Sequence, residues 1–183
     1  MKLAIFDMDG TLFNTNDVNY YAYKEALSKY NISLDYEYYC AHCNGRHYKV
    51  FIPELVGNNK EIIEEIHNNK KNLYKGFLNK TIVNKHLFEI IKSIKSEYKI
   101  ALVTTASKKN ALEMLEYTNT LEYFDLILTA ENVKNVKPNP EGFLLAMQHF
   151  NATSHETVIF EDSDVGIQAA RKTNASVIRI DKF

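Results

Sequence analysis

Five short apolar runs recur along the chain, and each is bounded by polar or turn-forming residues. They read KLAIF, KIALVT, FDLILT, TVIFE and SVIRI, at residues 2–6, 99–104, 124–129, 157–161 and 176–180. Runs of this length, apolar at consecutive positions, are typical of strands that are buried on both faces. We therefore expect the five runs to form one buried, parallel sheet.

Helical patterns lie between these runs. Residues 85–97, 108–117, 140–150 and 164–174 place apolar side chains at helical spacing, and Pro140 suits the first turn of its helix. Strands that alternate with helices form βαβ units. The expected fold class is therefore α/β, a Rossmann-like parallel sheet with helices on both faces.

The segment 14–80 interrupts this alternation. It shows helical patterns at 18–30, 46–56 and 60–78, and no apolar run that compares with the five strands. We therefore expect an α/β core domain of residues 1–13 and 81–183. A small, all-helical cap domain, residues 14–80, is inserted after the first strand.

The composition excludes some classes of partner. The chain has 183 residues, with 22 Lys and Arg against 23 Asp and Glu, and this balance predicts neither nucleic acid nor an anionic membrane as a partner. The first apolar run ends at Asp7, unlike a secretory signal, and no run is long enough to span a bilayer. Two cysteines do not build a disulfide framework. We expect a cytoplasmic protein; a monomer fits the sequence, which does not determine the oligomeric state.

Polar side chains follow four of the expected strands, at the edge where open α/β sheets bind ligands. They are Asp7 and Asp9, Thr104 and Thr105, Lys137, and Glu161 and Asp162. Crowded carboxylates repel one another, and Mg²⁺, which binds carboxylates together with substrate phosphate, compensates that repulsion. A lysine and a hydroxyl hold phosphate oxygens, and Gly10 lets the backbone approach a ligand. The sequence therefore predicts a site for phosphoryl transfer.

Four stretches resemble the four motifs of the haloacid dehalogenase-like phosphohydrolases, in the order of that family. They are IFDMDGTL, LVTT, VKPNP and FEDSDVGIQAA. The resemblance covers the expected core, whereas residues 14–80 resemble the helical cap of the family by position and type only. It implies a Mg²⁺-dependent phosphatase that hydrolyses a small phosphorylated metabolite, such as a sugar phosphate or a nucleotide.

The resemblance also implies roles for the acidic residues. Asp7 is expected to be the nucleophile that forms an aspartyl phosphate, and Asp9 to be the general acid and base. The Asp7 carboxylate, the Asp9 backbone carbonyl and Asp162 are expected to hold Mg²⁺. Glu161 is expected to be a further ligand or to act through a water molecule.

The same resemblance assigns the phosphate contacts. Lys137 is expected to neutralise the nucleophile and the phosphate, and Thr104 to hydrogen-bond the phosphoryl group. Counting back from the ASK stretch at 106–108 favours Thr105 instead, so both threonines remain candidates, with Thr104 preferred.

Other chemistries within this family are less well supported. Asp9 argues against a true dehalogenase, which needs no acid at that position. Phosphonate cleavage uses a Schiff-base lysine from the cap, where Lys49 is one of several lysines. A phosphosugar mutase of the beta-phosphoglucomutase type shares all four motifs and is the main alternative.

The mutase differs from this chain in the cap. It carries a histidine where this chain has Asn19, and an arginine shortly after a cap glycine, whereas here Arg46 follows Gly45 directly. Both departures weaken the mutase interpretation. We nevertheless expect Asn19, Gly45 and Arg46, with Asn14 and His47, to be substrate contacts.

Three non-enzymatic interpretations were weighed. A calcium loop needs its glycine at the sixth position, whereas Gly10 is fourth from Asp7. A phospho-accepting receiver domain of signalling proteins carries its acid pair near the N-terminus, whereas the pair Glu161–Asp162 comes last here. A binding protein that has lost turnover is not favoured, because every key residue is present.

The stretch Cys40-Ala41-His42-Cys43, with His47 nearby, suggests a metal or redox site. A structural zinc site commonly uses two separated ligand pairs, and the chain has no second cysteine pair. A redox pair would open a helix after a strand. We therefore expect these cysteines to be packing residues of the cap.

Overall fold

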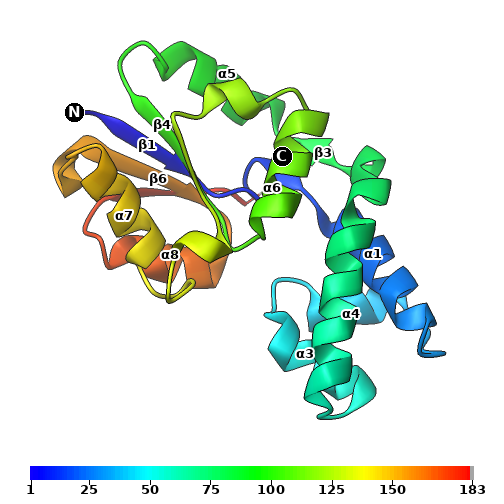
Figure 1. The fold of residues 1–183 in the computed structure, drawn as a ribbon. Coiled ribbons are helices and arrows are strands. Elements are labelled where there is room, and N and C mark those ends of the chain that lie inside the picture. Colours follow the sequence, from blue (N-terminus) through cyan, green and yellow to red (C-terminus); the bar gives the residue numbers. More distant parts are fainter. Residues whose placement is uncertain (182–183) are drawn as a thin grey trace. The chain divides into compact units, whose positions relative to one another are not determined.

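A parallel sheet lies at the centre of the first of two units into which the chain folds. The computed structural model describes residues 1–181. Unit 1 comprises Met1–Asn14 and the chain from Ile82 onward, and unit 2 comprises Thr15–Thr81. Figure 1 shows the elements of both units, which are described separately below.

The sheet of unit 1 has five strands in the order β5-β4-β1-β6-β7, and every neighbouring pair is parallel. The strands are β1 (Leu3–Phe6), β4 (Lys99–Val103), β5 (Leu126–Leu128), β6 (Thr157–Glu161) and β7 (Ser176–Arg179). Each of the five apolar runs is therefore a strand, and the predicted fold class is confirmed. The order places β1 and β6 side by side in the sheet, so the residues that follow them meet at one rim.

Helices cover both faces of the central strands, as their apolar runs predict, whereas the edge strand β7 is largely exposed and β5 is half-buried. On one face Leu3 and Ile5 pack against α7 (Glu141–His149) and α8 (Asp164–Arg171). On the opposite face lie α5 (Lys85–Ile94) and α6 (Lys108–Tyr117) (Figure 1). Full burial of a Leu or Ile side chain contributes about 1.5–3 kcal/mol. Burial of such side chains between the sheet and the helices on each face therefore stabilises the packing of the layers.

Two of the predicted helices end earlier than their apolar patterns. Helix α5 ends at Ile94, where the N–H groups of Glu97 and Tyr98 both donate to the Ile94 carbonyl and close a tight turn. Helix α8 ends at Arg171, and Asn174 follows with a left-handed φ of 59° that stops the helix. Short 3₁₀ turns complete unit 1, at Leu121–Tyr123, Ala130–Asn132 and Ser154–Glu156.

The regular elements of unit 2 are all helical. It contains α1 (Asn16–Ser28), α2 (Tyr36–Tyr38), a π-helical turn (Tyr39–Cys43), α3 (Tyr48–Val56), α4 (Lys60–Leu73) and a 3₁₀ segment (Tyr74–Lys80). Its core is rich in aromatic residues, with Tyr20, Tyr23 and Phe51 packed beside Leu27 and Ile66. The predicted helix over 60–78 is therefore two elements, because the chain tightens to 3₁₀ geometry from Tyr74.

Two very short strands lie where the chain leaves unit 1 and where it returns. Strand β2 (Phe13–Asn14) pairs antiparallel with β3 (Ile82–Val83), and these strands were not predicted. A strand of two residues is too short to show any periodicity in the sequence.

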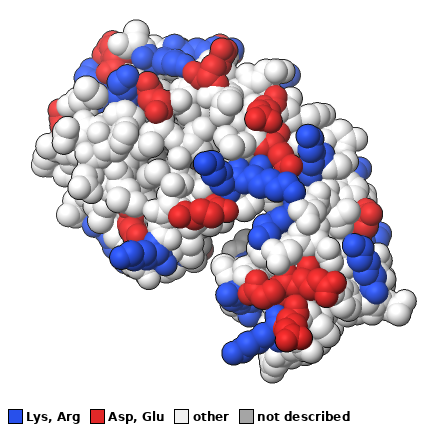
Figure 2. All heavy atoms as spheres, viewed as in Figure 1, with Lys and Arg blue, Asp and Glu red and all other residues white. Residues whose placement is uncertain are grey.

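Figure 2 shows the charged side chains on one face of the molecule. On the face seen in Figure 2, basic and acidic side chains lie next to one another on both units. Within residues 1–181, no helix is both long enough and apolar enough to cross a membrane. The cytoplasmic location remains a prediction.

Candidate active site

Asp7 is placed by the strand that precedes it. Its backbone N–H donates to the carbonyl of Phe160 at 3.0 Å, which continues the pairing of β1 with β6 by one residue. The residue is only 6% exposed. A carboxylate is therefore buried at the carboxyl end of the central strand, where burial of charge is unfavourable unless other groups compensate it.

The loop after Asp7 folds back tightly. The N–H groups of Leu12 and Phe13 both donate to the Met8 carbonyl, each at 3.0 Å. Gly10 has a left-handed φ of 89°, and a Cβ atom there would lie 2.1 Å from Oδ2 of Asp162. Only glycine therefore lets this loop lie against Asp162.

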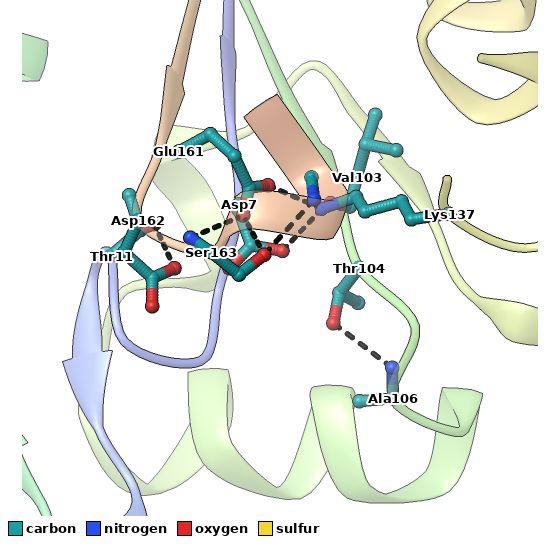
Figure 3. A network of polar contacts seen from close by, with 10 residues as sticks. Asp7, Thr11, Val103, Thr104, Ala106, Lys137, Glu161, Asp162 and Ser163 are labelled. Atoms are coloured by element: carbon teal, nitrogen blue, oxygen red, sulfur yellow. Dashed lines mark hydrogen bonds and ion pairs between the residues drawn. The ribbon is translucent and has the colours of Figure 1, made fainter. Parts of the chain in front are cut away.

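Lys137 compensates part of the buried negative charge. Its Nζ lies 2.5 Å from Oδ1 of Asp7 and 2.7 Å from Oε2 of Glu161, and donates to the carbonyl of Val103 at 3.1 Å (Figure 3). Burial lowers the pKa of Lys137, but the carboxylates of Asp7 and Glu161 outweigh that effect and the net shift is upward. The lysine is therefore a fixed cation between two acids.

One lysine does not balance three carboxylates. Oxygen atoms of Asp7, Glu161 and Asp162 all lie within 4.8 Å of one another. Burial, followed by the charge of Glu161, raises the pKa of Asp7 well above its ordinary value. The same two causes raise the pKa of Asp162 to about 6, against the hydrogen bond from Thr11.

A hard divalent cation fits this donor set. Closely spaced carboxylate oxygens are the ligands of Mg²⁺, and the surplus negative charge is what such a cation neutralises. Among residues 1–181, Asp7, Glu161 and Asp162 form the one acidic, histidine or cysteine cluster with this spacing. The residues present therefore fit a metal ion at the rim of the sheet.

Glu161 is held by the start of helix α8. The N–H and the hydroxyl of Ser163 donate to its Oε1 at 3.1 Å and 2.7 Å. The Ser163 oxygen in turn accepts from the N–H of Gly166 at 3.1 Å. A Cβ atom on Gly166 would lie 2.0 Å from the Glu161 carboxylate, so the carboxylate packs directly on the helix backbone. Both Glu161 oxygens thus have protein donors.

The two candidate threonines differ in burial. Thr104 is buried, and its Oγ1 accepts from the N–H of Ala106 at 3.0 Å, whereas Thr105 is exposed. Both threonines line one small cavity together with Lys137. Thr104 and Thr105 both stay candidates for the phosphate contact.

Asp9 lies in the folded-back loop, half-buried, and its backbone bridges to Phe13. Its side chain is not a member of the carboxylate cluster formed by Asp7, Glu161 and Asp162. That its backbone carbonyl holds the metal stays a prediction.

The candidate substrate contacts Asn19, Gly45 and Arg46 belong to unit 2. The amide of Asn19 donates to Oγ1 of Thr15 at 3.1 Å. Arg46 donates to both carboxylate oxygens of Glu54, at 3.0 Å and 2.5 Å, and also to the carbonyl of His42. Gly45 is exposed, with a left-handed φ of 74°.

The remaining residues named in the sequence analysis are Asn14, His47, Cys40 and Cys43. Asn14 is half-buried in β2. His47 is exposed, and its Nδ1 accepts from the N–H of Lys49 at the start of α3, at 3.3 Å. Cys40 is exposed, whereas Cys43 is buried in the core of unit 2, and both are free thiols. Burial raises the pKa of the Cys43 thiol, which favours packing over reactivity.

The sequence analysis did not identify two buried residues of the site. Thr11 donates through Oγ1 to Oδ1 of Asp162 at 2.9 Å, and Asn84 donates to the carbonyl of Thr11 at 3.1 Å. Thr11 lies within the first motif, but nothing in the sequence pairs it with Asp162. Asn84 precedes an apolar helical pattern, which is a signal for a helix N-terminus and not for a site.

The fold and the cluster together define the class of protein, an α/β enzyme with an acidic, lysine-bridged site at the rim of its sheet. A family profile described as haloacid dehalogenase-like hydrolase matches residues 4–180. The chain therefore belongs to the haloacid dehalogenase-like hydrolases, as its four motifs predict.

Two relatives that are named as phosphatases match almost the whole chain. A phosphorylated carbohydrates phosphatase of Thermotoga maritima is 30% identical, over 98% of this chain and 84% of the relative. A fructose-1-phosphate phosphatase of Escherichia coli is 28% identical, over 96% of this chain and 94% of the relative. The chain is thus similar to enzymes that are named as sugar-phosphate phosphatases.

One solved structure that is similar to this chain carries the name of a mutase. A Thermotoga maritima protein proposed to be a beta-phosphoglucomutase is 26% identical, with a TM-score of 0.76, over 100% of this chain and 87% of that one. The similarity therefore extends to both chemistries that the four motifs allow.

Proposed function

We propose that this chain is a Mg²⁺-dependent phosphatase that hydrolyses a small phosphorylated metabolite, with sugar phosphates as the first candidates. The observation that carries the proposal is the position of Lys137 between Asp7 and Glu161, with Asp162 beside them. The names of the two phosphatase relatives support the substrate class.

In the proposed mechanism, the Asp7 carboxylate attacks phosphorus while the bond from phosphorus to the ester oxygen breaks. Asp9 gives its proton to the departing oxygen, which leaves as an alcohol. Asp9, now ionised, takes a proton from water as that water attacks the aspartyl phosphate. Inorganic phosphate leaves, Asp7 is again a carboxylate, and Asp9 is again protonated.

Asp7, Asp162 and the Asp9 backbone carbonyl would hold Mg²⁺, which when bound offsets negative charge on the phosphoryl oxygens. Glu161 is better suited to an outer position, because Lys137 and Ser163 engage both its oxygens. Lys137 fixes the orientation of Asp7, and the Thr104 hydroxyl, with Thr105 as the alternative, would bind the phosphoryl group.

Selection of the substrate is proposed to depend on unit 2. In this proposal residues 14–80 are the cap domain, residues 1–13 and 81–183 are the core domain, and Asn19, Gly45 and Arg46 contact the substrate. Arg46 would have to exchange its ion pair with Glu54 for a substrate oxygen, and this pair is exposed, so it contributes little stability.

A phosphosugar mutase is the second candidate function, favoured by the similarity to the Thermotoga maritima structure. A mutase returns the phosphoryl group to a sugar hydroxyl, whereas a phosphatase gives it to water. The two functions therefore share the first half of the mechanism and differ in the acceptor.

The test is phosphate release from fructose 1-phosphate, other hexose phosphates, a nucleotide, pyrophosphate and p-nitrophenyl phosphate. Each compound is assayed with Mg²⁺ and with EDTA, and with Asp7→Asn as the control. The proposal predicts release that needs both the metal and Asp7. Isomerisation of a hexose phosphate without net release would support the mutase, and release that persists in EDTA would refute the metal dependence.

Asp9→Asn tests the general acid. The asparagine keeps the size and the backbone of the residue but removes the proton that the leaving oxygen needs. Turnover is expected to fall by about 10²- to 10⁴-fold, the usual contribution of general acid–base catalysis. A variant as fast as the parent enzyme on an alcohol leaving group would assign the acid to another residue.

A further inference from the structure

Thr11 and Asn84 form a buried connection to Asp162. Thr11 is 0% exposed and Asn84 is 3% exposed. Oγ1 of Thr11 donates to Oδ1 of Asp162 at 2.9 Å (Figure 3), and Nδ2 of Asn84 donates to the backbone carbonyl of Thr11 at 3.1 Å. Asn84, which follows β3, is therefore connected to the carboxylate of Asp162, which follows β6. The connection runs through Thr11, in the loop that follows β1.

Asn84 is fixed by two further hydrogen bonds. Its Oδ1 accepts from the N–H of Leu87 in the first turn of α5 at 3.2 Å. Its own N–H donates to the carbonyl of Leu12 at 2.9 Å. Because the oxygen is used at the helix N-terminus, the amide nitrogen can only face the loop. Asn84 thus joins helix α5 to the loop through the oxygen and the nitrogen of its side-chain amide.

The connection sets the orientation of Asp162. Thr11 binds one carboxylate oxygen, Oδ1, and the other, Oδ2, lies against Gly10. With one oxygen fixed by a buried hydroxyl, the carboxylate cannot rotate freely about its terminal torsion. Outer partners that orient a metal-binding group in this way commonly contribute 10- to 100-fold to metal affinity.

We propose that Thr11 and Asn84 are positioning residues, which hold Asp162 ready for a divalent cation although neither is assigned as a ligand. The inference rests on the proposed metal site, but it does not depend on the substrate. Thr11 acts directly on the carboxylate, and Asn84 acts one step further away by fixing the loop.

The first test is calorimetric titration of the metal-free protein with Mg²⁺ in three forms, the parent chain, Thr11→Val and Thr11→Ser. Valine has the shape of threonine without the hydroxyl, so the packing is kept and the hydrogen bond is lost. We expect Thr11→Val to bind Mg²⁺ about 10- to 100-fold more weakly. Thr11→Ser, which keeps the hydroxyl, is expected to stay within a few-fold of the parent.

The second test distinguishes the effect of Asn84 on the loop from its effect on the N-terminus of helix α5. Asn84→Asp keeps an oxygen for Leu87 but replaces the donor to Thr11, and is expected to weaken Mg²⁺ binding about 3- to 10-fold, the net worth of one hydrogen bond. Asn59→Ala is the matched control, because Asn59 accepts from Glu61 and Ile62 at the start of α4 in unit 2. It is expected to lower the melting temperature and leave the Mg²⁺ affinity unchanged.

The outcomes distinguish the two proposals. A parent chain that binds no Mg²⁺ would contradict the metal site and the positioning role together. A parent chain that binds Mg²⁺ while both Thr11→Val and Asn84→Asp bind it equally well would overturn the positioning role alone. Should Thr11→Val fail to fold, the pair Asn84→Asp and Asn59→Ala decides the question through the Mg²⁺-induced rise in melting temperature.

Discussion

The two units each bury a lysine, and they do so in opposite ways. Lys137 of unit 1 lies between the carboxylates of Asp7 and Glu161, at 2.5 Å and 2.7 Å. Lys70 of unit 2 lies over the rings of Tyr23 and Tyr74, at 5.2 Å and 4.7 Å from their centroids. The first lysine also lies over the ring of Phe143, but it is bound by more negative charge than it can neutralise, whereas the second lies over two uncharged rings.

The difference favours unit 1 as the unit that carries the chemistry. Aromatic rings attract a cation without carrying a net charge, so the Lys70 cluster is a packing arrangement that needs no ligand. Three carboxylates around one lysine leave a surplus charge that a bound cation compensates, and clusters of strongly shifted pKa values of this kind favour a functional site.

The largest expected contrast is in turnover. Asp7→Asn is expected to reduce phosphate release by about 10⁴-fold or more, as loss of a nucleophile does in other enzymes, with the fold retained. Tyr23→Phe, which removes a buried hydroxyl in unit 2, is the matched variant and is expected to keep near-normal turnover. Steady-state kinetics with circular dichroism would check both. Substantial activity in Asp7→Asn would remove the assigned nucleophile.

The second contrast uses the same substitution in both units. Lys137→Met leaves Asp7 and Glu161 buried without their cation and is expected to lower the free energy of unfolding by about 3 kcal/mol at pH 7 without metal. Lys70→Met loses ring contacts and is expected to lower it by about 1 kcal/mol. Urea denaturation measures both values. Equal losses of stability in the two variants would mean that the removal of Lys137 leaves no uncompensated charge on Asp7 and Glu161.

The smallest expected contrast is in the pH dependence of stability. Asp162 has its pKa raised from 3.8 to about 6, so without metal the folded chain binds more protons than the unfolded chain between these values. This contribution makes unit 1 less stable as the pH rises from 4 to 7. His67 has its pKa lowered from 6.5 to about 3, mainly by burial and then by Lys71, so its contribution to unit 2 is lost as the pH falls below 6.5.

Hydrogen exchange of peptides from each unit, at pH 5 and pH 7 without metal, would measure these opposite trends. His67→Phe, which keeps a ring stacked on Tyr48, is expected to remove about 1 kcal/mol of acid sensitivity from unit 2, a value reduced for the partial exposure of the ring. The same pH trend in both units, or an unchanged trend in His67→Phe, would contradict these assignments.

Much of the fold follows from the sequence, because strands buried on both faces must be apolar at consecutive positions. The five strands were predicted for this reason, although the edge strand β7 is largely exposed, and the α-helices of unit 1 were predicted from apolar residues at helical spacing. The strands β2 and β3 were not, because two residues carry no period, and the π-helical turn at Tyr39–Cys43 has no signal of its own.

The candidate site shows a similar division. Asp7, Glu161 and Asp162 were predicted to meet because the carboxyl ends of parallel strands lie at one rim of the sheet, and the structure brings them together. The contacts of Thr11 and Asn84 were missed, since they join a loop to a helix N-terminus through side-chain hydrogen bonds that no spacing in the sequence encodes.

The central claim is that the Asp7 carboxylate receives the phosphoryl group. The direct measurement is a rapid-quench experiment with excess enzyme and the best substrate of the panel, followed by borohydride reduction and peptide mass spectrometry. Reduction of an aspartyl phosphate converts that aspartate to homoserine, and the account predicts this change at residue 7, in the presence of Mg²⁺ only. Homoserine at another acidic residue, or at none while phosphate is released, would contradict it.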